Sequence, residues 1–239
     1  MRRYLFPLLT LIFLVPASAL ISSAQDERVT LDQSKVPSEG RKPSDFVPAG
    51  WKIENEVAGD LNGDSSSDVV LKLVEDKPEK DKDGDPTERQ RALVILFRNE
   101  AGGYVRAGVA GTILQCTRCG GAFYGVVETP ANVKIERGSV VIDQDHGSRD
   151  VTSTVYRFRY EGEAGEFVLI GFDYNDADRA TGMNVSESTN YLTGVRIVTR
   201  GRGKKDSTSK TQVGRKRIFI GDLDSDKFEE EAAQRLHLD

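Results

Sequence analysis

Residues 51–74 read WKIENEVAGDLNGDSSSDVVLKLV, the most informative stretch of the chain. Its two ends are rich in apolar and β-branched residues, which is typical of strands, and a polar loop that contains Gly separates them. We therefore expect two strands joined by a hairpin loop. A helix–loop–helix calcium motif is excluded, because it requires a bidentate Glu at position twelve of the loop, and Leu71 occupies that position.

The loop carries oxygen-bearing side chains at alternating positions. Counted from Asp60 as position one, Asn62, Asp64 and Asp68 occupy positions three, five and nine, and Ser66 at position seven offers a backbone carbonyl. Ca²⁺ takes six to eight oxygen ligands at about 2.3–2.6 Å, and a tight loop with this spacing can direct them at one ion. These five residues are the predicted calcium ligands. The alternative is a metal-free turn in which the same side chains accept hydrogen bonds from backbone amides.

Residues 51–74 resemble the calcium loops of FG-GAP repeats, which occur in integrin-like β-propellers and in related exported bacterial proteins. The resemblance implies calcium bound between two strands of one blade. The family has Gly at position six, where this chain has Ser65, and a left-handed backbone there costs on the order of 1 kcal/mol without Gly. The chain holds one clear loop of this type. A longer pattern with Cys-x-x-Cys-Gly-Gly and Tyr-x-Phe-Arg-Tyr also resembles a group of uncharacterised exported bacterial proteins.

The remainder of the chain reads as mainly β. Short runs rich in β-branched and aromatic residues recur, and several alternate apolar with polar residues, as at 155–160. We expect an antiparallel meander or sandwich with one FG-GAP-like hairpin and few helices, the best helical candidate being 227–236. The charged segment 75–90 and the Gly-, Ser- and Lys-rich segment 200–214 predict mobile surface loops. The predicted strands are 51–57, 68–74, 92–98, 104–109, 112–115, 133–136, 139–143, 153–160, 166–172, 191–199 and 215–220.

Four regions are predicted along the chain. Residues 1–24 combine two arginines, an apolar run and small residues, which is the pattern of a secretory signal peptide. Residues 25–45 are polar with Pro and Gly and predict a flexible linker, 46–222 a β-rich domain, and 223–239 an acidic C-terminal tail. The expected location is periplasmic or extracellular, with no membrane insertion after cleavage. The net charge of -5 argues against binding to nucleic acid.

The two cysteines, Cys116 and Cys119, stand in a Cys-x-x-Cys pair. In an oxidising compartment this spacing predicts a small disulfide that closes a turn. A redox pair and a metal site are the alternatives. A redox role needs a helix that begins at the first thiol, which the following Gly120 and Gly121 disfavour, and zinc would need two further soft ligands.

No catalytic residue is assigned, because the chain lacks a Gly-x-Ser-x-Gly motif and has only two histidines, of which His146 lies in a predicted polar turn. The predicted function is a structural or protein-interaction module with a secreted or envelope protein partner. Two alternatives stay open: a hydrolase that attacks an envelope polymer with carboxylates, and an inhibitor or binding protein for a secreted partner. Basic residues within 200–217 predict either contact with an anionic polymer or a solvated loop.

Overall fold

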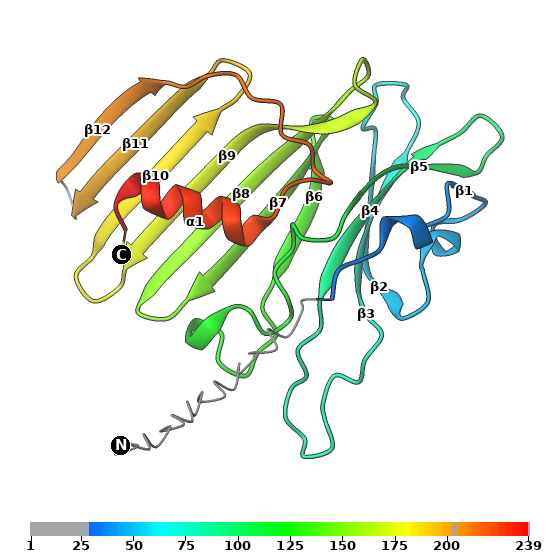
Figure 1. Ribbon diagram of the computed structural model, residues 1–239, viewed down its shortest axis with the longest axis horizontal. Helices are drawn as coiled ribbons and strands as arrows, with labels where there is room; N and C mark the ends of the chain where they lie inside the picture. Colours follow the sequence, from blue (N-terminus) through cyan, green and yellow to red (C-terminus); the bar gives the residue numbers. More distant parts are fainter. Residues whose placement is uncertain (1–28, 203–204, 239) are drawn as a thin grey trace, which may run out of the picture.

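The computed structural model describes residues 29–202 and 205–238, which form two antiparallel sheets (Figure 1). This confirms the mainly β prediction. The five-stranded sheet has the order β1-β5-β4-β3-β2 and the seven-stranded sheet the order β12-β11-β10-β9-β8-β7-β6. The strands are β1 (Glu39–Gly40), β2 (Trp51–Gly59), β3 (Asp68–Glu75), β4 (Arg91–Arg98), β5 (Tyr104–Ala110), β6 (Ala131–Glu136), β7 (Ser139–Gly147), β8 (Asp150–Glu161), β9 (Glu166–Asp178), β10 (Met183–Asn190), β11 (Val195–Arg202) and β12 (Lys205–Gln212).

The five-stranded sheet is covered on both faces, which explains why nearly every residue of β3 and β4 is buried. One face meets the core that it shares with the seven-stranded sheet. The other face is covered by residues that precede β2, including Leu31, Val36 and Phe46, whose exposed fractions are 5%, 2% and 0%. The described part of the predicted linker, from residue 29 on, is therefore part of the folded domain, because these apolar side chains close the second core.

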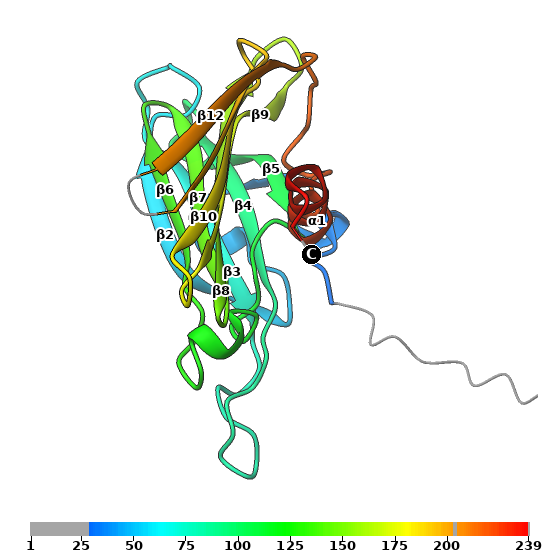
Figure 2. The same ribbon diagram turned by 90° about the vertical axis from the view of Figure 1, so that its left-hand side faces the viewer.

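The seven-stranded sheet has one packed face and one open face. Along β8, Thr154, Tyr156 and Phe158 are buried on one face, whereas Arg157 and Arg159 alternate with them on the other. The packed face meets the five-stranded sheet over one part and helix α1 (Ser225–Leu236) over another; Figure 2 shows α1 lying beside this face. The core shared by both sheets includes Val70, Leu93, Ile95, Val140, Ile142, Phe158, Phe167 and Leu169.

Helix α1 confirms the predicted helix at 227–236. Asp224 caps its N-terminus by accepting a hydrogen bond from the Lys227 N–H at 3.2 Å. Phe228 packs edge-to-face on Phe172, with ring centroids 4.9 Å apart, and Leu236 is 1% exposed. The segment predicted as an acidic tail thus packs on the sheet, because its apolar positions recur at helical spacing.

Three other segments differ from their predicted structure. Residues 205–212, predicted as part of a mobile loop, form edge strand β12 and pair with β11. Residues 112–115 are not a strand but a buried connection, in which Ile113 and Leu114 are fully buried. Residues 215–220, predicted as a strand, contribute only a single bridge between Phe219 and Val168.

The predicted signal peptide, residues 1–24, lies outside the described residues. Within the described part of the chain, no helix is both long enough and apolar enough to span a bilayer.

Candidate functional site

The loop at 60–67 joins β2 to β3, which pair antiparallel with Gly59 opposite Asp68. Asp60 begins the loop and accepts two backbone hydrogen bonds, from the Gly63 N–H at 2.7 Å and from the Ser65 N–H at 3.0 Å. Ser65 has a φ of 67°, the left-handed conformation that the family pattern assigns to Gly. The hairpin loop therefore has the backbone turn that the sequence predicted at position six.

The next two predicted ligands form successive local turns. The Asn62 Oδ1 accepts a hydrogen bond from the Asp64 N–H at 3.0 Å, and the Asp64 Oδ1 accepts one from the Ser66 N–H at 2.6 Å. The Asn62 amide also donates to the other Asp64 oxygen at 2.9 Å. Hydrogen bonding to the Ser66 backbone, and then to the Asn62 side chain, lowers the pKa of Asp64. Asp64 is therefore held as a carboxylate on an exposed loop.

Asp68 differs from the other ligands because its side chain is fully buried. Its two oxygens accept backbone hydrogen bonds on opposite sides, from the Leu61 N–H and the Arg98 N–H, each at 2.9 Å. Burial raises the pKa of Asp68, the two hydrogen bonds oppose that shift, and the nearby carboxylates of Asp64 and Asp60 raise the pKa further. Asp68 thus ties the loop to β4 and lies in the negative field of the other two acids.

The donor set fits a hard cation in chemistry, since it consists of three carboxylates, one amide and one backbone carbonyl. Each oxygen that accepts one hydrogen bond keeps a second lone pair. The carboxylates are spread out, however: they are not among the described groups of three whose ligand atoms all lie within 4.8 Å of one another. A bound ion would draw them together.

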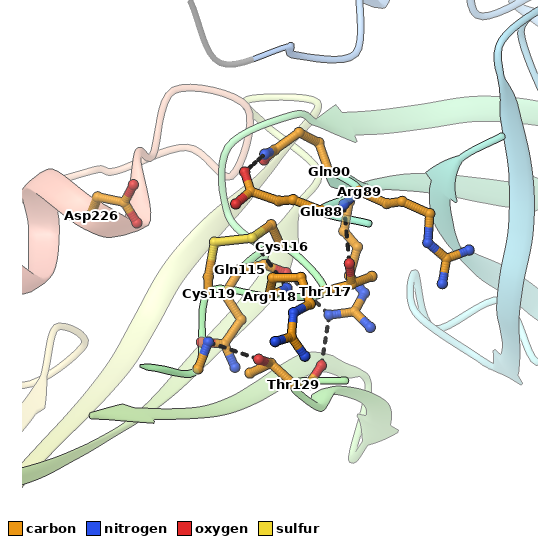
Figure 3. The surroundings of a disulfide bond; sticks show 12 residues. Glu88, Arg89, Gln90, Gln115, Cys116, Thr117, Arg118, Cys119, Thr129 and Asp226 are labelled. Carbon is orange, nitrogen blue, oxygen red and sulfur yellow. Dashed lines mark hydrogen bonds between the residues drawn. A yellow bond between two sulfur atoms is a disulfide. The ribbon is translucent and has the colours of Figure 1, made fainter. Parts of the chain in front are cut away.

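Cys116 and Cys119 form a disulfide, as predicted, with Cα atoms 5.1 Å apart (Figure 3). Glu88 lies beside the two sulfurs, within 4.8 Å. Because both sulfurs are bonded to each other, neither is a thiolate that could ligate a metal or attack a substrate. The Thr129 hydroxyl accepts a hydrogen bond from the Gly120 N–H at 2.7 Å, which fixes the turn after the disulfide. The disulfide therefore closes a local turn.

His146 lies near the end of β7 and not in a polar turn, because β7 extends past the predicted strand 139–143. Its Nε2 contacts the Glu229 carboxylate of α1 at 2.8 Å. The Tyr156 hydroxyl donates to the same carboxylate at 3.1 Å, and burial raises the pKa of Tyr156 well above its usual value. The contacts of His146 and Tyr156 with Glu229 therefore hold α1 against the seven-stranded sheet.

The partners of Asp68 were not predicted, since the Leu61 and Arg98 donors are backbone groups that no side-chain pattern reveals. Glu187 was not predicted either; its side chain is fully buried on β10 between Arg196 and Arg235.

The fold and the loop define a class: a two-sheet antiparallel β protein with an Asp- and Asn-rich hairpin loop and one short-range disulfide. Comparison of the chain with protein-family models, with curated proteins and with solved structures found no match.

Proposed function

We propose that this protein is an exported structural or protein-interaction module whose hairpin loop at 60–68 binds one calcium ion. Asp60, Asn62, Asp64 and Asp68 would supply side-chain oxygens and Ser66 its backbone carbonyl. The ion would fasten β2 to β3 and stabilise the domain by an amount that grows with the logarithm of free calcium above the dissociation constant. The partner would be a secreted or envelope protein.

One observation carries the proposal: three carboxylates are gathered at one tight loop, where Asp60 and Asp64 accept hydrogen bonds from loop amides and the buried Asp68 accepts one from the loop's Leu61 N–H. Burial raises the pKa of Asp68, and the charges of Asp64 and Asp60 raise it further. Carboxylates that repel one another at a tight loop gain free energy when a cation neutralises them. The left-handed Ser65 adds support, because it lets the loop curl with its polar side chains at alternating positions. A metal-free turn accounts for the backbone hydrogen bonds, including the two that Asp68 accepts, but it leaves the repulsion among the three acids without a compensating charge.

Calcium binding is tested by titrating the purified, chelator-treated protein with Ca²⁺ in a calorimeter. The proposal predicts one site per chain and a loss of affinity of at least about tenfold in Asp64→Ala, since charge-assisted ligation by one carboxylate is removed. Asp81→Ala is a matched control, because Asp81 likewise accepts hydrogen bonds at an exposed acidic loop, from the Asp83 and Asp85 N–H groups at 2.9 Å.

Equal calcium affinity in the Asp64→Ala variant and the native chain would place the site elsewhere. No heat of binding in the native chain would leave the loop as a metal-free turn. Export is tested separately, by determining the N-terminus of the protein isolated from its native cell. The proposal predicts a chain that begins after about residue 24; an intact Met1 would contradict it.

A further inference from the structure

The open face of the seven-stranded sheet carries a basic groove, although the chain as a whole is acidic, with a net charge of -5. The groove consists of two hollows of about 560 and 350 Å³ that meet at Ile170, which lines both. We call them together the arginine groove. Its cationic lining residues come from three segments that are far apart in sequence: Arg137, Arg157, Arg159, Arg215, Lys216 and Arg217.

The pairing of β9 explains why the hollows meet at Ile170. The register between β8 and β9 shifts between Arg157 and Phe158, which leaves Ile170 between Leu169 and Gly171 as an unpaired bulge residue. Before the bulge, β9 bonds the segment that follows β12, because the Leu169 N–H donates to the Ile218 carbonyl at 2.8 Å. After it, β9 pairs with β10. This change of partner brings residues 215–217 to the edge of the open face.

Cations outnumber acids in the arginine groove. The acids that line it are Glu136 and Glu161; Glu136 pairs with Lys134 at 2.7 Å and Glu161 with Arg217 at 3.2 Å. Arg157 pairs with Asp173 at 2.7 Å. The side chains of the other four cations make no hydrogen bond or ion pair within the described part of the chain, namely those of Arg137, Arg159, Arg215 and Lys216.

Like charges gathered in one groove repel one another, and an anionic ligand relieves that repulsion. Arginine is suited to such a ligand, because its planar guanidinium binds carboxylate, sulfate or phosphate oxygens through two parallel hydrogen bonds. The two hollows adjoin and cations line both of them. An extended ligand with repeated negative charges therefore fits the groove better than a single small ion does.

The lining also discriminates among classes of polyanion. Binding of single-stranded nucleic acid requires exposed aromatic rings on which bases stack, and the one aromatic lining residue, Tyr191, is only 8% exposed. A peptide that binds by adding a strand to the sheet requires a free strand edge, but here the edge of β9 is already bonded by residues 218–220. An acidic peptide bound only through its side chains is distinguished by the comparison with polyglutamate below. A polysaccharide needs neither feature, only side-chain donors and a small apolar floor such as Val168, Ile170 and Leu192 provide.

We propose that the arginine groove binds an acidic polysaccharide chain through its anionic groups, with Arg137, Arg159 and Arg215 as principal contacts. This site is separate from the calcium loop and does not depend on it.

The test measures the binding of fluorescently labelled polygalacturonate, by anisotropy at an ionic strength of about 0.15 M, where the Debye length is about 8 Å, to the native chain and to two triple variants. In Arg137→Gln/Arg159→Gln/Arg215→Gln we expect affinity to fall at least about tenfold, since three charge-assisted contacts are removed. The control Arg41→Gln/Lys80→Gln/Lys82→Gln removes the same charge from exposed positions outside the groove and is expected to bind within about twofold of the native chain, because distant exposed charges are screened.

Equal losses in the two triple variants would show non-specific charge attraction and overturn the proposal. Binding of neutral dextran as tightly as polygalacturonate would overturn the role of the anionic groups. Tighter binding of polyglutamate or single-stranded DNA would assign the groove to a different class of polymer. Thermal melts verify that each variant is folded, and the single variant Arg159→Gln, at an exposed position, provides the same comparison if the triple variant does not fold.

Discussion

The Asp60 carboxylate accepts a hydrogen bond from the backbone N–H of Ser65 at 3.0 Å while Ser65 holds a φ of 67°. In a residue other than Gly, this left-handed conformation costs roughly 1 kcal/mol. Ser65→Gly is therefore expected to raise the free energy of unfolding by about 1 kcal/mol, measured by urea denaturation without calcium. Ser67→Gly is the control, because Ser67 does not have a positive φ, and it is expected to be neutral or destabilising. Destabilisation by Ser65→Gly would contradict the strained backbone.

Asp68 and Asp64 are expected to differ in their effect on stability when calcium is absent. Asp68→Ala leaves the buried Leu61 N–H and the partly buried Arg98 N–H without their acceptor, so a loss of about 2–4 kcal/mol is expected from two unsatisfied donors. Asp64→Ala removes an exposed side chain and is expected to cost less than about 1 kcal/mol. Chelator-treated proteins compared by urea denaturation test this order, and equal losses would show that Asp68 does not tie the loop to β4.

Glu187 is expected to be a principal stabilising contact between β10, β11 and α1. Its fully buried carboxylate binds Arg196 at 3.1 Å and Arg235 at 3.0 Å. Removing one member of a buried ion cluster leaves uncompensated charge, so Glu187→Ala is expected to cost about 3–5 kcal/mol. Glu230→Ala, at an exposed position of the same helix, is expected to cost at most about 0.5 kcal/mol. A loss below 1 kcal/mol for Glu187→Ala in urea denaturation would refute this assignment.

The contact of His146 with α1 predicts a pH-dependent stability. The hydrogen bond to Glu229 raises the pKa of His146, burial opposes the shift, and the Glu229, Asp226 and Asp145 charges add to it. Because the folded pKa lies above the unfolded value of about 6.5, the stabilisation is fully present below that value and is lost as pH rises through the folded pKa.

Relative to His146→Gln, the native chain is thus expected to gain stability below about pH 6.5, by about 0.5 kcal/mol after solvent screening, and to lose this advantage at alkaline pH. Urea denaturation across this pH range measures the difference. His237→Asn is the control, since Asn tolerates the left-handed conformation at that position. A difference between the native chain and His146→Gln that does not change with pH would show that the imidazolium does not hold α1.

Short sequence patterns predicted the parts of the fold that depend on residues close together in the sequence. The hairpin around 60–68, the left-handed Ser65, the Cys116–Cys119 disulfide and the helix near 227–236 all depend on residues within a few positions of one another. Strand β10 was not predicted, because its sequence MNVSESTN has few apolar residues. Its buried face contains Glu187, which pairs with Arg196 of β11 and Arg235 of α1, and Thr189, which donates a hydrogen bond to Glu187.

The missed parts depend on contacts between distant segments. Leu31 and Val36 lie in the polar stretch 25–45 that was predicted as a linker, and only the second face of the five-stranded sheet, which they cover, explains their burial. The arginine groove joins side chains around positions 137, 157 and 215 through the register of β8 and β9 and the path of residues 213–220, which no local pattern encodes.

The measurement that tests the calcium proposal most directly is a thermal melt of the chain without residues 1–24, followed by the fluorescence of its single tryptophan, Trp51, in β2. Calcium binding at the loop predicts a higher midpoint in excess calcium than in chelator, a difference that Asp64→Ala abolishes and Asp81→Ala retains. Superimposable melts in calcium and chelator would contradict it.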